Sequence, residues 1–494
     1  MINDYLAEQI MQDFGFYPTI QQAEVARKLA DFVLSPNPEG VFILKGFAGT
    51  GKTSVISALV SALEKVRKDS TTLIAPTGRA AKVLSLYSNH QAHTIHKRIY
   101  RQKSIDKDSL FELDFNMKSN ILFICDEASM ISNDNYSGNS LYGTGRLLDD
   151  MIHFIYGGKG CRLLLVGDTA QLPPVGDSES IALQEDAMRG YGLDVTTYTM
   201  TQVVRQADTS GILWNATHLR QLISDEDIFM LPKIKFSGFS DVINISGNEL
   251  IDALEQCYAR DGEDETIVVT RSNKRAVIYN NGIRNQVLWR DSELTSGDIL
   301  MIAKNNYYWT DKYNAETRED AKENGIDKKD VTLTPFDFIA NGDTAVVRRV
   351  RNEREFYGFR FADCQLEFPD YDDFEMEVTV ILDTLNAEAP ALTPEQQTKL
   401  FNGVYEDYFD KKTKSEKLKA MKQDPYFNAL QIKYSYAITC HKAQGGQWAN
   451  VFIDQGYMTE DMLGPEYFRW LYTALTRARK NVYLVNWKEE QTMN

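Results

Sequence analysis

The stretch Gly46-Phe47-Ala48-Gly49-Thr50-Gly51-Lys52-Thr53 matches the pattern G-x-x-x-x-G-K-[ST] at every required position. The apolar run 41–44 before it is typical of a buried parallel strand. After it, apolar residues recur at helical spacing, at Val55, Ile56, Leu59, Leu63 and Val66. The pattern predicts a strand, a glycine-rich turn and a helix, an arrangement whose N–H groups suit nucleotide phosphates.

Each position of this turn has an expected role. Lys52 would reach the β- and γ-phosphates, and the Thr53 hydroxyl would ligate Mg²⁺. The expected nucleotide-binding residues here are Gly46, Ala48, Gly49, Thr50, Gly51, Lys52, Thr53 and Ser54. Such a loop indicates a nucleoside triphosphate and a metal ion, and the process that the nucleotide drives must be inferred from the rest of the chain.

The composition is that of an ordinary globular protein. Of 494 residues, 43% are hydrophobic and 25% charged, and this length suggests roughly two to four domains. No run of about 18 apolar residues occurs, which argues against a membrane span, and the first residues lack the pattern of a secretion signal. The five cysteines are scattered without a C-x-x-C pair, so we expect a cytoplasmic protein without structural zinc.

The net charge of −16 argues against a protein that coats nucleic acid non-specifically. It does not exclude a nucleic-acid groove, because the basic residues close to a groove set the local field.

Two acidic residues follow a later apolar run. Residues 121–124 read as a buried strand, after which Asp126 would hold Mg²⁺ through its water shell and Glu127 would polarise the attacking water. A further strand at 162–166 leads to Asp168, and Gln171 would place an amide near the γ-phosphate. Together with the phosphate loop, these residues predict nucleotide hydrolysis.

Some candidates stay open on their local pattern alone. Gln22 has the donor and acceptor that an adenine edge requires, but a glutamine at the start of a surface helix is the more common case. Pro76 and Thr77 end a predicted strand, where α/β sheets bind ligands. The two histidines in His93-Thr94-Ile95-His96 are either structural or in contact with phosphates. Arg205 is either a surface charge or an arginine finger.

The second half of the chain changes character twice. A strand at 266–270 indicates a second α/β unit, and the densely charged residues 311–330 are expected to form an exposed loop or linker. The hairpin signal at 341–343 and the short alternating runs after it predict a small antiparallel β-barrel. Residues 98–119 are expected to form a small inserted hairpin, and α/β character returns near residue 432.

In this order, the blocks resemble the superfamily 1 DNA helicases of the RecD and phage Dda branch, over nearly the whole chain. The blocks TCHKAQG at 439–445 and TALTRA at 473–478 carry much of the resemblance. It implies that Gln22, or Gln21, reads adenine, that Gly445 belongs to a motif joining DNA to nucleotide, and that Arg205 and Arg477 are catalytic arginines. The residues that it implies for strand contact are Pro76, Thr77, His93, Thr94, His96, Thr439, His441 and Lys442.

The resemblance also implies an architecture and a reaction. The fold would be α/β, with two RecA-like parallel-sheet domains and a small antiparallel β-barrel inserted in the second. Residues 1–204 would form the first domain, 205–330 and 425–494 the second, and 331–424 the barrel and a helical return. The chain would be a monomeric motor that uses ATP and Mg²⁺ and moves 5′-to-3′ on single-stranded DNA, in a bacterial or phage-infected cell. Expected partners are single-strand/duplex junctions and replication or repair proteins.

Two alternatives compete with a DNA helicase. One is a nucleotide-switched loading factor that clamps a partner without unwinding, and the other is an RNA-directed motor. The paired arginines Arg205 and Arg477 argue against the loading factor, because they suggest self-contained turnover. Cys440 is a departure within its motif, and Tyr100 and Phe111 are the candidates for the tip of a duplex-splitting pin in segment 98–119.

Overall fold

The computed structural model describes residues 2–66, 70–102, 111–133, 143–203, 210–326, 331–336, 338–458 and 462–493. Their contacts divide the chain into two compact units. The first unit comprises Met1–Asn244, Ala443–Val451 and Tyr457–Asn494, and the second comprises Ile245–Lys442 and Phe452–Gly456. Residues 443–451 and 457–494, here termed the C-terminal stretch, therefore belong to the same unit as the phosphate loop.

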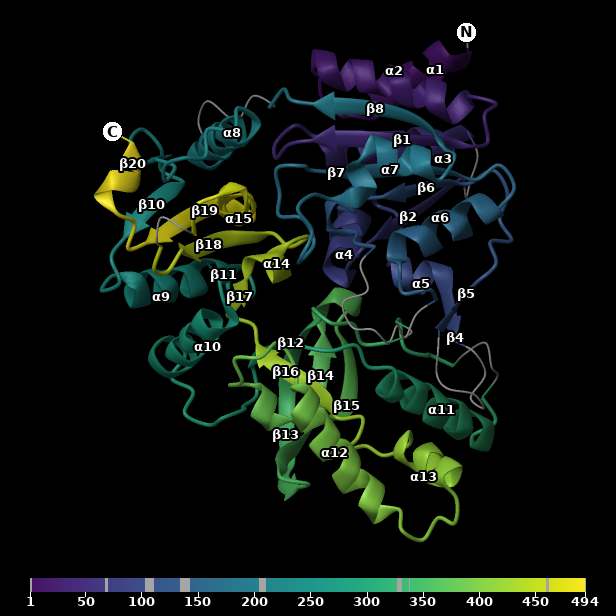
Figure 1. Cartoon of the computed structure of the whole chain (residues 1–494), viewed down its shortest axis with the longest axis vertical. Helices are drawn as coiled ribbons and strands as arrows, with labels where there is room; N and C mark the ends of the chain where they lie inside the picture. Colours follow the sequence, from purple (N-terminus) through teal and green to yellow (C-terminus); the bar gives the residue numbers. More distant parts are fainter. Residues whose placement is uncertain are drawn as a thin grey trace. The chain divides into compact units, whose positions relative to one another are not determined.

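A six-stranded parallel sheet forms the centre of the first unit (Figure 1). Its strand order is β3-β2-β6-β7-β1-β8. The strands are β1 (Gly40–Gly46), β2 (Thr71–Ala75), β3 (Ala92–Thr94), β6 (Leu122–Cys125), β7 (Arg162–Gly167) and β8 (Asp194–Met200). Because these strands are parallel, their C-terminal ends lie at one edge of the sheet, which is where α/β sheets bind ligands.

Helices on this sheet bury the apolar residues that the sequence spacing singled out. Helices α1 (Ile2–Gln12), α2 (Ile20–Leu34) and α3 (Lys52–Val66) share one core with strand residues such as Phe42 and Leu164. Val55, Ile56, Leu59 and Leu63 of α3 are buried as the spacing predicts, but Val66, the last residue of the helix, is 68% exposed. The remaining helices before β8 are α4 (Gly78–Ser88), α5 (Ile95–Ile99), α6 (Leu147–Gly157) and α7 (Glu185–Gly190), with short 3₁₀ turns η1 (Ala128–Met130) and η2 (Ile181–Leu183).

An antiparallel ribbon of β4 (Tyr100–Gln102) and β5 (Phe111–Leu113) forms the predicted inserted hairpin. Residues 103–110, which connect the two strands in sequence, lie outside the described residues, as does the side chain of Phe111. Tyr100 is buried, and its hydroxyl donates to Asp150 Oδ2 at 2.7 Å. Tyr100 therefore anchors the base of the ribbon and is not an exposed pin tip.

A second sheet has the strand order β10-β19-β18-β11-β17. These strands are β10 (Val242–Ile245), β11 (Thr266–Thr270), β17 (Ala437–Thr439), β18 (Trp448–Asp454) and β19 (Ala478–Val485). The helices of this part of the chain are α8 (Gly211–Ser224), α9 (Leu250–Asp261), α10 (Asn273–Gly282), the π-helix η4 (Ile283–Val287), α14 (Cys440–Ala443) and α15 (Pro465–Leu475). A small pair of strands, β9 (Ile234–Lys235) and β20 (Thr492–Met493), is parallel, and the 3₁₀ turn η8 (Glu489–Gln491) precedes β20.

A closed five-stranded barrel lies in the second unit. Its strands are β12 (Ile299–Ile302), β13 (Thr344–Phe356), β14 (Phe359–Phe368), β15 (Phe374–Ile381) and β16 (Leu430–Tyr434), with 3₁₀ turns η5 (Pro369–Tyr371) and η6 (Leu382–Thr384). With the two sheets, it confirms the predicted fold class. Two of its strands, β12 and β16, come from outside residues 331–424, and the domain boundaries stay a proposal.

The barrel is antiparallel except for one pair. Strands β15 and β16 pair in parallel, with Val380 opposite Leu430. Helices α12 (Pro394–Asp407) and α13 (Lys414–Met421) lie between these two strands in the chain (Figure 1). They bury Leu400, Val404 and Met421 against Phe359 and Phe361 of β14. A connection of this length lets the chain return in the same direction, which a short hairpin does not allow.

The prediction of a loop at 311–330 is wrong for most of that stretch, because residues Tyr308–Glu323 form helix α11. Trp309, Thr310 and Ala321 are buried on one side of the helix, and the charged residues face outward. Charged side chains such as Lys and Glu favour helices, and Lys312 and Glu316 pair at a spacing of four residues. Charge density alone therefore does not separate a solvated helix from a loop.

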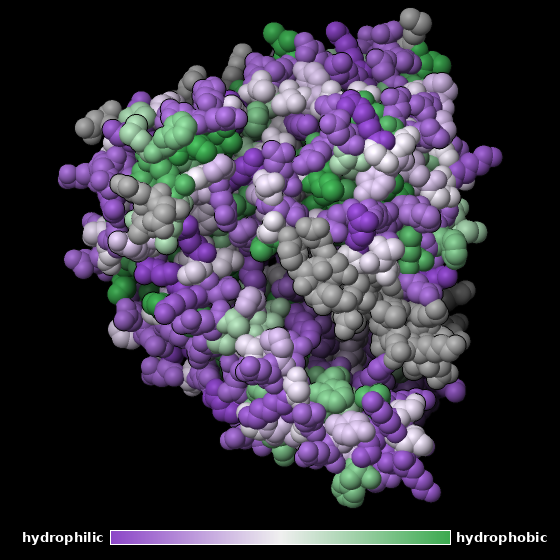
Figure 2. Space-filling model, in the orientation of Figure 1, coloured by the Kyte–Doolittle hydropathy of each residue, from purple (hydrophilic) through white to green (hydrophobic). Residues whose placement is uncertain are grey.

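In the view of Figure 2, the surface is mostly hydrophilic, and apolar side chains lie in separate groups among polar ones. This agrees with the excess of 70 acidic over 54 basic residues. None of the described helices has the length and apolar character needed to cross a membrane.

Candidate functional site

The phosphate loop joins β1 to α3 in the way that the sequence predicts. Gly49 and Gly51 adopt φ angles of +75° and +86°, which side chains other than glycine rarely adopt. A Cβ atom on Gly49 would also lie 2.9 Å from Leu213 Cδ2. Glycine is therefore required at this position both by the backbone conformation and by the neighbouring side chain.

Lys52 bonds the loop itself in this structure. Its Nζ donates to Gly46 O at 2.7 Å and to Phe47 O at 3.1 Å. The Thr50 hydroxyl donates to Phe47 O at 2.8 Å, which assigns Thr50 a role in holding the loop shape. Thr53 and Ser54 occupy the first turn of α3, where backbone N–H groups have no partner within the helix. A phosphate group would meet both these N–H groups and the ammonium of Lys52.

Gln22 and Gln21 both bond protein groups. Gln22 is buried, closes a capping box with Thr19 at the start of α2, and its Nε2 donates to Thr50 O at 3.4 Å. Gln21 Oε1 accepts from the N–H groups of Thr201 and Gln202 at 2.8 and 2.7 Å. Adenine reading by either carboxamide would require these bonds to change.

Asp126 and Glu127 follow β6 at the same edge of the sheet. Asp126 Oδ1 accepts from Glu127 N–H at 2.8 Å. Burial, and then repulsion from Glu127, raise the pKa of Asp126 to about 7, while Lys52 opposes the shift. Glu127 has a φ of +51°, in the left-handed region where a side chain is strained. Strain of this kind persists only where the surrounding structure enforces it, and it is common at active sites.

Asp168 and Gln171 follow β7. Asp168 is fully buried, and its Oδ1 accepts from Ala170 N–H at 2.9 Å. The Oε1 atom of Gln171 is buried and has no hydrogen-bond partner in the described structure. Gln171 lines a cavity of about 290 Å³ together with Phe47, Ser129 and Arg469. An unpaired amide oxygen beside the phosphate loop can accept a bond from a water molecule.

The C-terminal stretch brings Arg477 and Gly445 into the first unit. Arg477 is buried, and its Nε, Nη1 and Nη2 donate to Thr473 O at 3.1 Å, Gly446 O at 3.4 Å and Thr476 Oγ1 at 3.2 Å. The guanidinium therefore bonds its own segment in this structure. Gly445 has a φ of +73°, and a Cβ there would lie 3.3 Å from Thr77 Oγ1. Arg205 lies outside the described residues.

One residue of the site was missed by the reasoning from sequence. The Tyr472 hydroxyl accepts from Ala48 N–H at 2.8 Å and donates to Asp168 Oδ2 at 2.6 Å. Tyr472 directly precedes the recognised block 473–478, and this adjacency was the only signal in the sequence.

The predicted strand-contact residues of the first unit gather at the ends of β2 and β3. Thr77 caps α4 and Thr94 caps α5, each accepting a backbone N–H at 3.2 Å. The parallel register sets Ala75 beside Thr94, so Pro76 and Thr77 lie near His93 and Thr94. Burial lowers the pKa of His96 to about 4, so its ring is neutral at pH 7. His96 is therefore not a cationic phosphate contact in this structure.

In the second unit, Thr439 ends β17, and His441 and Lys442 lie in α14. Thr439 pairs with Thr270 of β11. Burial lowers the pKa of Lys442 to about 8, which indicates a lysine in a poorly solvated position.

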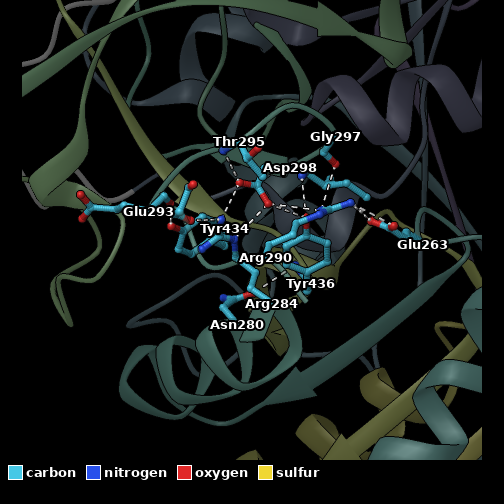
Figure 3. A network of polar contacts seen from close by, with 12 residues as sticks. Glu263, Asn280, Arg284, Arg290, Glu293, Thr295, Gly297, Asp298, Tyr434 and Tyr436 are labelled. Atoms are coloured by element: carbon cyan, nitrogen blue, oxygen red, sulfur yellow. Dashed lines mark hydrogen bonds and ion pairs between the residues drawn. The ribbon is translucent and has the colours of Figure 1, made fainter. Parts of the chain in front are cut away.

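A buried polar network fixes the chain where it passes from barrel strand β16 to β17 (Figure 3). Arg284 forms two bonds of 2.9 Å to the carboxylate of Asp298, and both side chains are buried. The Tyr436 hydroxyl accepts from Ile299 N–H at 3.0 Å and lies 3.1 Å from Asp298 Oδ1. Arg290 links Asp298 to Glu263. The segment leading to Thr439 is therefore firmly attached to the barrel.

Comparison with known proteins agrees with this arrangement. Residues 20–228 match the AAA domain family, and residues 434–485 match the UvrD-like helicase C-terminal domain. The chain is 30% identical over 195 residues to the ATP-dependent RecD2 DNA helicase of Deinococcus radiodurans, a match covering 39% of this chain and 22% of that protein. It is 23% identical to the ATP-dependent DNA helicase dda of Enterobacteria phage T4, over 90% of this chain and 93% of that protein. These matches support a superfamily 1 helicase of the RecD and Dda type.

The chain also matches a longer relative. It is 25% identical over 490 residues to an uncharacterized protein of Methanocaldococcus jannaschii. The match covers 92% of this chain and 37% of that protein. The chain thus spans little more than a third of that relative. The two family matches contain the phosphate loop, Asp126-Glu127 and Gln171 in the first, and Lys442 and Arg477 in the second.

Proposed function

We propose that the chain is an ATP-dependent DNA helicase, which hydrolyses ATP, moves along single-stranded DNA and separates duplex strands. One observation carries this proposal. The phosphate loop, Asp126-Glu127 and Gln171 follow β1, β6 and β7 at one edge of a parallel sheet. At the same edge, Thr77 follows β2 and Thr94 is the last residue of β3. Nucleotide and DNA strand would therefore contact neighbouring loops of a single sheet.

Each nucleotide-site residue has a defined task in the proposal. Lys52 leaves its bonds to the loop carbonyls and binds the phosphates, Glu127 takes a proton from the attacking water, and Gln171 orients that water. Arg477, and Arg205 with it, would stabilise the charge that develops on the transferred phosphoryl group. Gln22 would contact the adenine after its bond to Thr50 O has opened.

The donor set fits a Mg²⁺ ion. The Thr53 hydroxyl and the Asp126 carboxylate are hard oxygen ligands, and Mg²⁺ in such sites takes most of its other ligands from waters and phosphates. A nearby divalent cation would favour the ionised form of Asp126, whose pKa is raised to about 7 without it. When bound, the ion would neutralise phosphate charge. The described residues contain no group of three or more His, Cys, Asp or Glu side chains suited to a metal ion, so phosphate oxygens would complete the site.

The proposed strand contacts bind the DNA backbone and not the bases. Helix α4 presents a capped N-terminus at Thr77, and Lys442 adds a positive charge, both of which suit phosphates of any sequence. The 5′-to-3′ direction, a monomeric state, a cytoplasmic site of action, and replication or repair proteins as partners are part of the proposal through the family resemblance. All five cysteines are free thiols and buried, as a reducing compartment allows.

The test uses ATP hydrolysis and strand separation by one preparation. We expect ATPase activity that rises strongly with single-stranded DNA, unwinding of a 5′-tailed but not a 3′-tailed duplex, and loss of both activities in Lys52→Ala. ATPase activity that is indifferent to DNA, together with no unwinding of either duplex, would contradict the proposal and favour a loading factor. Stronger stimulation by RNA than by DNA of the same sequence would favour an RNA-directed motor.

A further inference from the structure

The loop Asp168–Leu172, which follows β7, is tied to the C-terminal stretch of the same unit. The N–H of Leu172 donates to Thr473 Oγ1 at 2.9 Å, and its carbonyl accepts from Gln444 Nε2 at 2.6 Å. All three residues are buried. Because both backbone groups of Leu172 are bonded, the C-terminal stretch fixes the backbone immediately after Gln171.

Tyr472 connects the same loop to the phosphate loop. An ionised carboxylate can only accept and an N–H can only donate, so the hydroxyl of Tyr472 donates to Asp168 and accepts from Ala48. The exposed fraction is 1% for Tyr472 and 0% for Asp168. Burial, together with the charge of Asp168, raises the pKa of Tyr472 well above its ordinary value, so the hydroxyl keeps its proton.

The C-terminal stretch also lies against a strand-contact residue. Gly445 is close enough to Thr77 that a Cβ on it would be 3.3 Å from the Thr77 hydroxyl oxygen. Gln444, the residue before it, bonds Leu172. If a bound DNA strand displaced Thr77, Gly445 would move with it, and Gln444 would transmit this movement to Leu172, the residue after Gln171.

Resting on the proposed helicase function, we propose that Tyr472 is a positioning residue that couples the phosphate loop to the Asp168–Leu172 loop. DNA binding at Thr77 would act on the C-terminal stretch, and the Tyr472 hydroxyl of that stretch then sets Gln171 relative to Ala48 and thereby raises the rate of ATP hydrolysis. The Gln171 amide oxygen, which is buried without a partner, is the group whose position matters. Tyr472 itself touches neither nucleotide nor water in this scheme.

The test compares Tyr472→Phe with Tyr467→Phe. Tyr467 lies in the same helix α15, is 2% exposed, and its hydroxyl accepts from Gln491 Nε2 at 3.3 Å. The quantity measured is the stimulation factor, which is kcat with saturating single-stranded DNA divided by kcat without DNA. Since the lost bond is to a charged buried group, we expect this factor to fall about tenfold or more in Tyr472→Phe. It should stay within about twofold of wild type in Tyr467→Phe, with similar Tm for both variants.

A purely structural role for Tyr472 would lower kcat equally with and without DNA and leave the stimulation factor unchanged, which would overturn the inference. If Tyr472→Phe does not fold, Thr473→Val decides, because it removes the acceptor of the Leu172 N–H. A fall of the factor in Thr473→Val supports the coupling, and an unchanged factor overturns it. A wild-type chain without any DNA stimulation would instead overturn the proposed function itself.

Discussion

Two neighbouring residues at the candidate site have energetically unfavourable features. Glu127 has a left-handed backbone, and the carboxyl of Asp126 beside it has a raised pKa. Both features cost folding free energy, on the order of 1–3 kcal/mol for a strained backbone of this kind. Proteins retain such costs mainly where chemistry requires them, which supports assigning the water-activating role to Glu127.

His96 provides a pH-dependent test at the level of one residue. Its folded pKa of about 4 lies below the ordinary value of 6.5, so the unfolded chain binds the proton first as the pH falls. Stability is therefore complete above about pH 6.5 and is lost progressively as the pH falls towards 4. Between pH 7 and pH 5, the free energy of unfolding of the wild-type chain should fall. We expect this fall to be about 1–2 kcal/mol smaller in His96→Gln.

Urea unfolding of wild type and His96→Gln at the two pH values measures this difference. His153→Gln is the matched control, because His153 is exposed on α6. If the two variants show the same pH dependence, burial of His96 does not depress its pKa.

The geometry of the phosphate loop was predictable because a local pattern determines it. Its eight residues are consecutive, so their spacing alone predicts the turn between β1 and α3. Gln22 and Tyr472 differ, because their partners are 28 and 424 residues away in sequence. No local pattern contains the bond between Tyr472 and Ala48 or the bond between Gln22 and Thr50, whereas the capping box of Thr19 and Gln22 follows a local sequence pattern.

At the scale of elements, the junction between β16 and β17 depends on a buried charge pair (Figure 3). Removing one member of such a pair leaves the other charge buried without compensation, which typically costs about 3–5 kcal/mol. We therefore expect Asp298→Ala to lower the free energy of unfolding by about 3–5 kcal/mol, measured by chemical denaturation.

Asp291→Ala is the control for this substitution, because Asp291 is an exposed aspartate seven residues before Asp298 in the same segment. Its expected effect is within about 0.5 kcal/mol. Equal stability of the two variants would mean that the network is not needed to hold the barrel strand in place.

Elements were predictable where their apolar residues have a clear period. The short strands that end in the motifs were identified because an apolar run of four or five residues followed by polar or glycine-containing motif residues is too short for a buried helix. Helix α11 was missed because it buries few residues, and most of its face is charged. The parallel pairing of β15 with β16 follows from the route of the chain through α12 and α13, which pairing patterns in the sequence do not specify.

At the scale of the whole molecule, the proposed function requires an acidic chain to bind DNA through a few local contacts. With a net charge of −16, the overall field repels the DNA backbone. The affinity for DNA then depends on helix N-termini, such as that of α4, and on individual cationic side chains along the proposed path of the single-stranded DNA. Binding should therefore show a shallow salt dependence compared with that of strongly basic DNA-binding proteins.

Lys442 is the cation whose contribution can be measured directly. Burial lowers its pKa to about 8, so an approaching phosphate would compensate for lost solvation. For single strands, the logarithm of the binding constant falls with the logarithm of salt concentration by about 0.7 for each phosphate contact. We expect Lys442→Gln to reduce this slope by about 0.7, whereas Lys414→Gln, on the exposed face of α13, should leave it unchanged. Fluorescence anisotropy titrations of a labelled oligonucleotide at several salt concentrations give the slope, and an equal slope in both variants would exclude Lys442 from the strand path.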